Sequence, residues 1–185
     1  MGKITVETCQ IEGLKVVTPT VFGDERGYFM ETYNYNDFKE AGIDMEFVQD
    51  NQSASKKGVL RGLHFQIPPM AQAKLVRVTR GAVFDVVVDL RKGSATFGKW
   101  QGFTLSAENF LQLLVPKGMA HGYMTLTGHV EFLYKVDAPY APGHEGGIRW
   151  NDPDLNIAWP DLPPILSDKD LRLPLWAESG IQFSI

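Results

Sequence analysis

The chain has 185 residues, of which 44% are hydrophobic and 22% are charged. This composition is typical of a globular domain large enough to bury a continuous core, so we expect a single domain over residues 1–185. The formal net charge of −4 argues against general binding to nucleic acid or to anionic membranes, because both partners favour a basic surface.

The predicted elements are mainly short strands. A brief helix is expected over Asn36 to Ala41, which stops at Gly42. Several later stretches are strand-like: residues 59–66, 74–79, 82–90, 110–115 and 130–135. The strongest signal is residues 82–90, whose β-branched content and partial alternation suit a strand better than an amphipathic helix. Turn signals separate these stretches at Gly81, at Gly118 and at Gly128. Strands with this spacing predict an all-β sandwich or barrel.

The end of the chain differs from the predicted strands. The proline-rich stretch from Trp159 to Pro174 predicts a segment that wraps over the barrel and forms no separate domain. Within it, Ser167 and Asp170 have the spacing of a helix N-terminal cap, although Asp fits the second position less well than Glu.

No membrane anchor or secretory leader is evident. No run approaches the roughly 18 consecutive apolar residues of a membrane span, and the stretch from Met1 to Lys15 lacks the apolar core of a signal peptide. Cys9 is the only cysteine, so no internal disulfide can form. These features predict a cytoplasmic protein.

Two polar residues interrupt the apolar stretch of residues 59–66, namely Arg61 and His64. Histidine can act as a base near neutral pH. A buried histidine satisfied by core contacts explains this stretch about equally well. Lys74 at the start of the next strand and Tyr134 within the last one are further candidates, although a solvated lysine and a packing tyrosine are the commoner cases.

His121 has glycine neighbours that permit either a close backbone approach or a tight turn. Together with His64 it raises the alternative of a metal site, because some β-barrels hold a metal with several histidines. The sequence argues against that site. Gln66 stands where the second member of a His-x-His pair is expected, and His129 and His144 lie in polar, turn-like segments.

Three basic residues are candidates for binding phosphate: Arg26, Arg61 and Lys169. Arginine can hold a phosphate with two hydrogen bonds, although a surface ion pair is the commoner role for each of these residues. The glycine-rich strand-to-helix loop that binds dinucleotides and triphosphates is absent from the sequence.

Several longer motifs occur together in one order: FGDERGYFMETYN, FVQDNQS, VLRGLHFQ, AKLVRV, FDVVVDLRKGSATFGKW, LSAEN, PKGMAHGY, EFLYK, WNDPDLNIAWP and LSDKD. Through them the chain resembles the dTDP-4-dehydrorhamnose 3,5-epimerase family from Phe22 to beyond Asp170. The resemblance implies an all-β, cupin-type small barrel of jelly-roll kind with short helices. It also implies a homodimer, a dTDP-sugar substrate, and a reaction that uses no metal and no organic cofactor.

The resemblance also implies roles for individual residues. His64 matches the general base, Asp170 the carboxylate that orients it, Tyr134 the general acid, and Lys74 the group beside the developing enolate oxygen. The other matching positions are expected to contact the sugar or the nucleotide: Arg26, Glu31, Gln49, Asn51, Arg61, His121, Glu145 and Lys169. Of these, Arg26 and Glu31 are expected to reach the site of the neighbouring subunit.

The implied reaction inverts carbons 3 and 5 of dTDP-4-keto-6-deoxy-D-glucose to give dTDP-4-keto-L-rhamnose, in the biosynthesis of dTDP-L-rhamnose. A relative that inverts one carbon, or that moves the ketone between carbons 3 and 4, is a close alternative. A non-catalytic sugar-nucleotide binder and a metal-dependent oxygenase are more distant ones.

Overall fold

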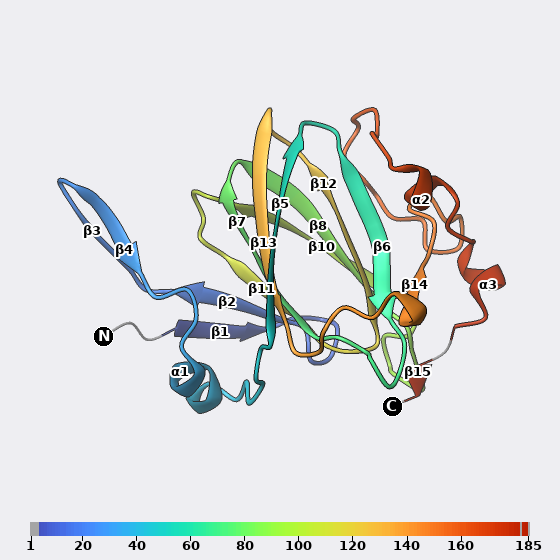
Figure 1. Ribbon diagram of the computed structural model, residues 1–185, viewed down its shortest axis with the longest axis horizontal. Coiled ribbons are helices and arrows are strands. Elements are labelled where there is room, and N and C mark those ends of the chain that lie inside the picture. Colours follow the sequence, from blue (N-terminus) through green and yellow to red (C-terminus); the bar gives the residue numbers. More distant parts are fainter. Residues whose placement is uncertain (1–3, 182, 185) are drawn as a thin grey trace.

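The computed structural model describes residues 4–181 and 183–184; residues 1–3, 182 and 185 of the predicted domain lie outside this part. The centre of the fold consists of two facing antiparallel sheets (Figure 1). In spatial order, the six-stranded sheet contains β1 (Ile4–Thr8), β2 (Lys15–Pro19), β11 (Gln112–Val115), β7 (Lys74–Arg80), β13 (His129–Val136) and β5 (Gln49–Lys56). The five-stranded sheet contains β10 (Trp100–Ser106), β8 (Ala82–Asp89), β12 (Met119–Thr125), β6 (Leu60–Gln66) and β14 (Glu145–Gly147).

The remaining elements are short. β3 (Val21–Asp24) and β4 (Gly27–Met30) form a hairpin that projects away from both sheets (Figure 1), and β9 (Arg91–Lys92) pairs with β15 (Phe183–Ser184). The helical elements are α1 (Tyr35–Glu40), the 3-10 helix η1 (Pro142–His144), α2 (Asp168–Leu171) and α3 (Trp176–Ser179). In the part of the chain that the structure describes, none of these helices is long and apolar enough to cross a membrane.

Strand β8 is buried on both of its faces. Val83 and Val87 belong to the core between the two sheets, whereas Val86 and Val88 belong to a second core on the outer face of the five-stranded sheet. Burial on both faces explains why this strand is a nearly continuous apolar run. Side chains at odd-numbered positions of β8 therefore point into the space between the sheets.

The second core is covered by the end of the chain, which lies along the five-stranded sheet (Figure 1). Trp159 and Trp176 pack against this core, and Ile165 exchanges backbone hydrogen bonds with Gly58 and Leu60. The prediction that residues 159–174 wrap over the sheet is therefore confirmed. The wrapping places α2 next to β6, which becomes important for the active site.

The all-β, jelly-roll-like architecture expected from the sequence is confirmed, although the two sheets do not join into one closed barrel. The strand predicted over residues 110–115 begins only at Gln112. Phe110 lies between the preceding turn and β11 and has a positive φ of 57°, a conformation that no apolar pattern could reveal. Helix α1 is displaced by one residue from its prediction because Asn34 caps it through its side chain.

Candidate active site

A cavity of about 290 Å³ lies between the two sheets. Both sheets and helix α2 contribute to its wall, so it forms where the sandwich is open. Its lining residues are mostly polar or aromatic: Ser53, Arg61, His64, Lys74, His121, Gly122, Tyr123, Phe132, Tyr134, Ser167, Lys169 and Asp170. Seven residues predicted from the sequence are among them: Arg61, His64, Lys74, His121, Tyr134, Lys169 and Asp170.

His64 and Asp170 form a hydrogen-bonded pair on one wall of this cavity. The distance between His64 Nε2 and Asp170 Oδ1 is 2.6 Å. The His64 side chain is 32% exposed, whereas that of Asp170 is 5% exposed. An ionised carboxylate accepts the proton of Nε2, so Nδ1 of the neutral ring keeps its lone pair and can act as a base.

The carboxylate of Asp170 is itself fixed by its neighbours. Ser167 Oγ donates to Asp170 Oδ2 at 2.7 Å, and the backbone N–H of Gly62 donates to Oδ1 at 3.4 Å. Burial acts to raise the pKa of Asp170, but the hydrogen bonds from His64 and Ser167 outweigh it and lower that pKa. Asp170 is therefore an anion at neutral pH. Ser167 also caps α2 as predicted, since its Oγ accepts from the Asp170 N–H.

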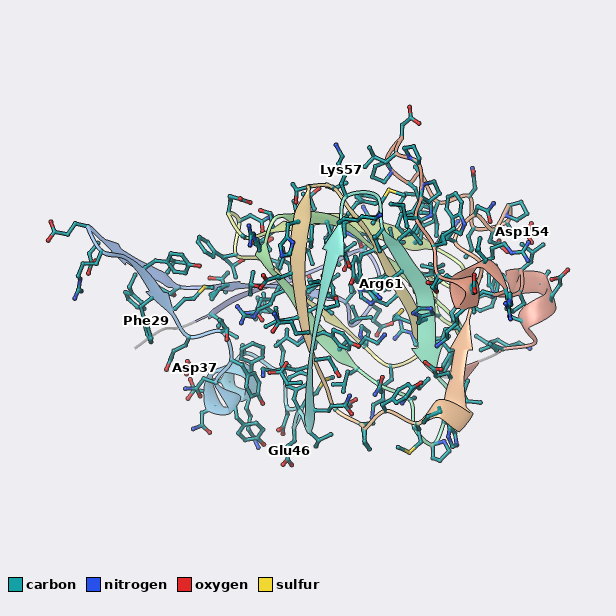
Figure 2. All side chains as sticks on the ribbon, turned by 45° about the horizontal axis from the view of Figure 1, so that its top comes forward. Phe29, Asp37, Glu46, Lys57, Arg61 and Asp154 are labelled. Carbon is teal, nitrogen blue, oxygen red and sulfur yellow. The ribbon has the colours of Figure 1, made fainter. Side chains whose placement is uncertain are left out.

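An irregularity in β6 brings Arg61 and His64 to the same cavity. Residues three apart in a regular strand point to opposite faces of a sheet. Here His64 pairs with His121 and Arg61 with Tyr123, so β6 contains one more residue than β12 between these two pairs. This bulge turns both side chains toward the space between the sheets. Figure 2 shows Arg61 between β5 and β6.

Glycine is required at the bulge for a steric reason. Gly62 has a φ of 117°, and a Cβ atom there would lie 2.6 Å from the Cα of Gly122 on β12. The sequence left open whether the glycines near His121 make a turn or a close approach, and the structure shows both: Gly118 has a φ of 84° in the turn before β12, whereas Gly122 makes the close approach to β6. The turn alternative for His121 is wrong, because this residue lies in the middle of the buried strand β12.

Tyr134 lies on the opposite sheet from His64. It belongs to β13 and follows Val130 and Phe132 on the inward face of that strand. Burial raises its pKa above the ordinary value, although Arg61 acts in the other direction. The phenol therefore keeps its proton at neutral pH and is a donor facing the base across the cavity.

Lys74 begins β7 and supplies a cation to the cavity. Burial lowers its pKa to about 8, and the negative charges of Asp85 and Glu145 limit this decrease. At neutral pH the ammonium is mostly charged. It can stabilise negative charge that develops on a bound molecule, and it loses this ability in mildly alkaline solution.

Asp85 is a residue that sequence reasoning missed. It lies on the inward face of β8, and its two oxygens are 3.0 and 2.9 Å from Nε2 of His121. The signal was present in the sequence. When apolar residues occupy both alternating faces of a strand, a single aspartate among them must also be buried.

Five predicted residues do not line the cavity of this chain. Glu145 lies at its rim and pairs with Lys169 at 2.8 Å. Gln49 and Asn51 bond to each other through their side chains on β5. The last two, Arg26 and Glu31, belong to the projecting hairpin and its C-terminal end, and Arg26 pairs there with Asp24 (Figure 1).

The residues in the described ranges form no group of three or more His, Cys, Asp and Glu side chains that could hold a metal ion. The two histidines of the cavity each face their own carboxylate. A paired base, a facing phenol and a partly buried ammonium are suited to removing and returning a proton next to a carbonyl group.

Comparisons with known proteins identify close similarity. A family model described as dTDP-4-dehydrorhamnose 3,5-epimerase matches residues 8–178. The chain is 55% identical over 164 residues to the dTDP-4-dehydrorhamnose 3,5-epimerase of Shigella flexneri, covering 88% of this chain and 91% of that protein.

Solved structures give the same picture. The Bacillus anthracis dTDP-4-dehydrorhamnose 3,5-epimerase with TDP and pyrophosphate bound has a TM-score of 0.91 and 51% identity, covering 93% of this chain and 99% of that one. The Legionella pneumophila dTDP-6-deoxy-D-glucose-3,5-epimerase in complex with dTDP-4-keto-L-rhamnose has a TM-score of 0.89 and 46% identity, covering 93% and 92%.

Proposed function

The chain belongs to the dTDP-4-dehydrorhamnose 3,5-epimerase family, and from this premise we propose that His64 and Tyr134 invert carbons 3 and 5 of dTDP-4-keto-6-deoxy-D-glucose. The product is dTDP-4-keto-L-rhamnose, an intermediate of dTDP-L-rhamnose biosynthesis. The observation that carries the proposal is the placement of a His–Asp pair and a protonated tyrosine on opposite walls of one cavity.

The chemistry begins with an acidic C–H bond. Both carbon 3 and carbon 5 neighbour the keto group at carbon 4, so the carbanion formed at either one delocalises into an enolate. His64 Nδ1 removes the proton, and Asp170 stabilises the imidazolium that results. General acid–base catalysis of this kind contributes about 10²–10⁴-fold when the base contacts the proton.

Inversion requires that the new proton arrive from the face opposite to the base. Tyr134 is on the other sheet and holds its proton at neutral pH. It therefore serves as the acid. Lys74 lies in the same cavity and stabilises the enolate oxygen until reprotonation. After the first inversion the imidazolium releases its proton to solvent and the Tyr134 phenolate takes one up, so the same three groups can act on the second carbon, and no electron transfer is needed.

Deuterium incorporation tests this proposal directly. In deuterated water the wild-type protein is expected to introduce deuterium at carbons 3 and 5 of the substrate, as followed by NMR. Replacing Tyr134 by phenylalanine should impair protonation of the enolate. Inverted product should then form far more slowly than His64 exchanges the substrate proton with solvent. The substitution removes one hydroxyl group and keeps the ring.

The other outcomes of the labelling experiment separate the alternatives. Deuterium at a single carbon after long incubation would identify an enzyme that inverts only that carbon. An unlabelled substrate would point to a sugar-nucleotide binder or to a different substrate. Inversion of both carbons by Tyr134→Phe at the wild-type rate would contradict the role proposed for Tyr134.

The nucleotide part of the substrate needs cations and hydrogen-bond donors at the mouth of the cavity. Arg61 is exposed there, and its guanidinium donates to Ser55 Oγ at 3.2 Å. Lys169 forms an ion pair with Glu145 at 2.8 Å. We assign the diphosphate and sugar contacts to the remaining predicted positions of this chain: Gln49, Asn51, Arg61, His121, Glu145 and Lys169.

The projecting hairpin supports a homodimer in which each chain completes the site of the other. Its tip carries Arg26, and its aromatic residues Tyr28 and Phe29 are each 60% exposed. Figure 2 shows Phe29 on this hairpin, away from the two sheets. Exposed aromatic side chains of this kind are typical of surfaces that bind another chain. We assign Arg26 and Glu31 to the cavity of the partner subunit.

Mixing two inactive variants tests this assignment. If Arg26 acts across the interface, a dimer of one Arg26→Ala chain and one His64→Ala chain has one intact site. Random reassociation of equal amounts should then restore about a quarter of the wild-type sites, because half of the dimers are mixed and each has one active site. Activity no greater than the sum of the separate variants would show that Arg26 serves its own chain.

A further inference from the structure

Asp85 is a fully buried carboxylate in the interior of the sandwich. Its exposure is 0%, and it lies on β8 between Val83 and Val87, which are both part of the core. Burying a charge without a partner is strongly unfavourable. A residue of this kind is therefore expected either to stabilise local structure or to act on the cavity that it faces.

A second buried aspartate on the same strand shows what a structural role looks like. Asp89 is also 0% exposed, and it accepts hydrogen bonds from Arg91, Ser94 and Thr96. These bonds fix the chain as it leaves β8. The contacts of Asp89 are thus with the loop that follows its own strand.

Asp85 has a different set of contacts. Within residues 4–181 and 183–184, its side-chain hydrogen bonds are with one residue, His121, whose Nε2 lies 3.0 and 2.9 Å from its two oxygens. His121 is 6% exposed and lines the cavity, as does Lys74. Asp85 therefore connects to the cavity through His121 and fixes no turn.

We propose that Asp85 is a positioning residue of the epimerisation, which holds His121 with its proton on Nε2 and keeps the Lys74 ammonium charged beside the sugar. The inference rests on the proposed function. Because Nε2 of His121 donates its proton to Asp85, Nδ1 is the ring nitrogen that remains available to contact the sugar. The ring also stacks against Phe132, with centroids 6.2 Å apart, which restricts its rotation.

The electrostatic part of the proposal concerns Lys74. Burial lowers the pKa of Lys74 to about 8, and Asp85 is the first of the charges that oppose this decrease. The titratable and charged groups that face the cavity from the surrounding elements are Arg61 and His64 on β6, His121 and Tyr123 on β12, Tyr134 on β13, Glu145 on β14, and Lys169 and Asp170 on α2. Burial raises the pKa of Asp85, whereas the neighbouring His121 and Lys74 act to lower it. In its ionised form Asp85 favours the charged form of Lys74, so replacing its carboxylate should lower the pKa of Lys74 further.

The test is the Asp85→Asn variant of the full chain, which preserves shape and removes the charge. We expect kcat to fall on the order of 10–100-fold, as is usual when a carboxylate partner of a functional histidine is lost, with a smaller change in KM. The alkaline limb of the kcat/KM profile should move to lower pH. In ¹⁵N NMR of histidine-labelled protein, the His121→Gln variant identifies the signals of His121. In Asp85→Asn these signals should no longer show a protonated Nε2 and an unprotonated Nδ1.

Asp89→Asn is the matched control, because it removes an equally buried carboxylate from the same strand. It is expected to lower the melting temperature and to leave the alkaline limb in place. A folded Asp85→Asn protein whose alkaline limb and His121 signals match the wild type would overturn the proposal, whether or not its kcat falls.

The NMR measurement also separates this inference from the proposed function. It needs no turnover, so it remains decisive if the wild-type protein acts on a different sugar. If Asp85→Asn fails to fold, the wild-type spectrum alone decides. A His121 ring without a proton on Nε2 would contradict the proposal.

Discussion

Replacing His64 by alanine is expected to lower kcat/KM on the 4-keto sugar by about 10²–10⁴-fold, because general base catalysis contributes this much. Deuterium should no longer enter at carbon 3 or carbon 5. The variant also leaves the carboxylate of Asp170 without its closest partner. Steady-state kinetics together with NMR of the substrate in deuterated water measures both effects.

A control separates loss of the base from damage to the fold. His129→Ala removes a histidine that is 47% exposed and pairs with Glu131 on the surface of β13, and it should leave the rate near the wild-type value. Added imidazole can occupy the space left in His64→Ala and should restore part of the exchange. Wild-type exchange in His64→Ala would show that another group is the base.

Replacing Lys74 by methionine is expected to lower kcat by about 10²–10³-fold, the usual loss when one donor to a developing oxyanion is removed. Methionine keeps much of the aliphatic volume, so the packing of the strand end should survive. The measurement is the initial rate of epimerisation with the variant saturated by substrate. A decrease confined to KM would show that Lys74 binds the ground state and leaves the transition state unaffected.

The pH profile gives an independent readout of Lys74. The pKa of this lysine is lowered by burial to about 8, so the ammonium is present below that pH and is lost as the pH rises through it. The rate of the wild-type protein should accordingly fall above about pH 8, because in the mechanism we propose the ammonium stabilises the enolate. Lys74→Met should lack this limb.

Lys15→Met is the control for both measurements on Lys74. Lys15 belongs to the same sheet but is outside the cavity, where it donates to the carbonyl oxygen of Gly42. Its loss should change neither the rate at neutral pH nor the alkaline limb. An alkaline limb that persists in Lys74→Met would assign the titration to another residue.

The strands could be predicted from the sequence where side-chain chemistry determines the backbone. Residues 74–79 and 82–90 are rich in β-branched residues and residues 130–135 contain Val130, Phe132 and Tyr134, and each of these stretches forms a strand. The start of β11 was misplaced because Phe110 takes a left-handed backbone conformation that depends on its surroundings. Which strands pair with which could not be read from local pattern, since β2 and β11 are neighbours although they are far apart in sequence.

The active site was predictable only in part from the residues themselves. His64 could be selected as a base, but its spacing from Asp170 carries no local signal because 106 positions separate them. Their association was expected from the resemblance to the family alone. The bulge at Gly62 was equally hidden, because regular alternation places Arg61 and His64 on opposite faces.

The wrapping of the C-terminal segment over the five-stranded sheet has a consequence for protein synthesis. All strands of the two main sheets are complete by Gly147, whereas Ser167 and Asp170 come later. On the ribosome, a nascent chain therefore contains every strand of both sheets before it contains the carboxylate that pairs with His64. A chain terminated between Gly147 and Ser167 would keep all these strands, but it would lack that carboxylate and also Trp176, which packs against the core on the outer face of the five-stranded sheet.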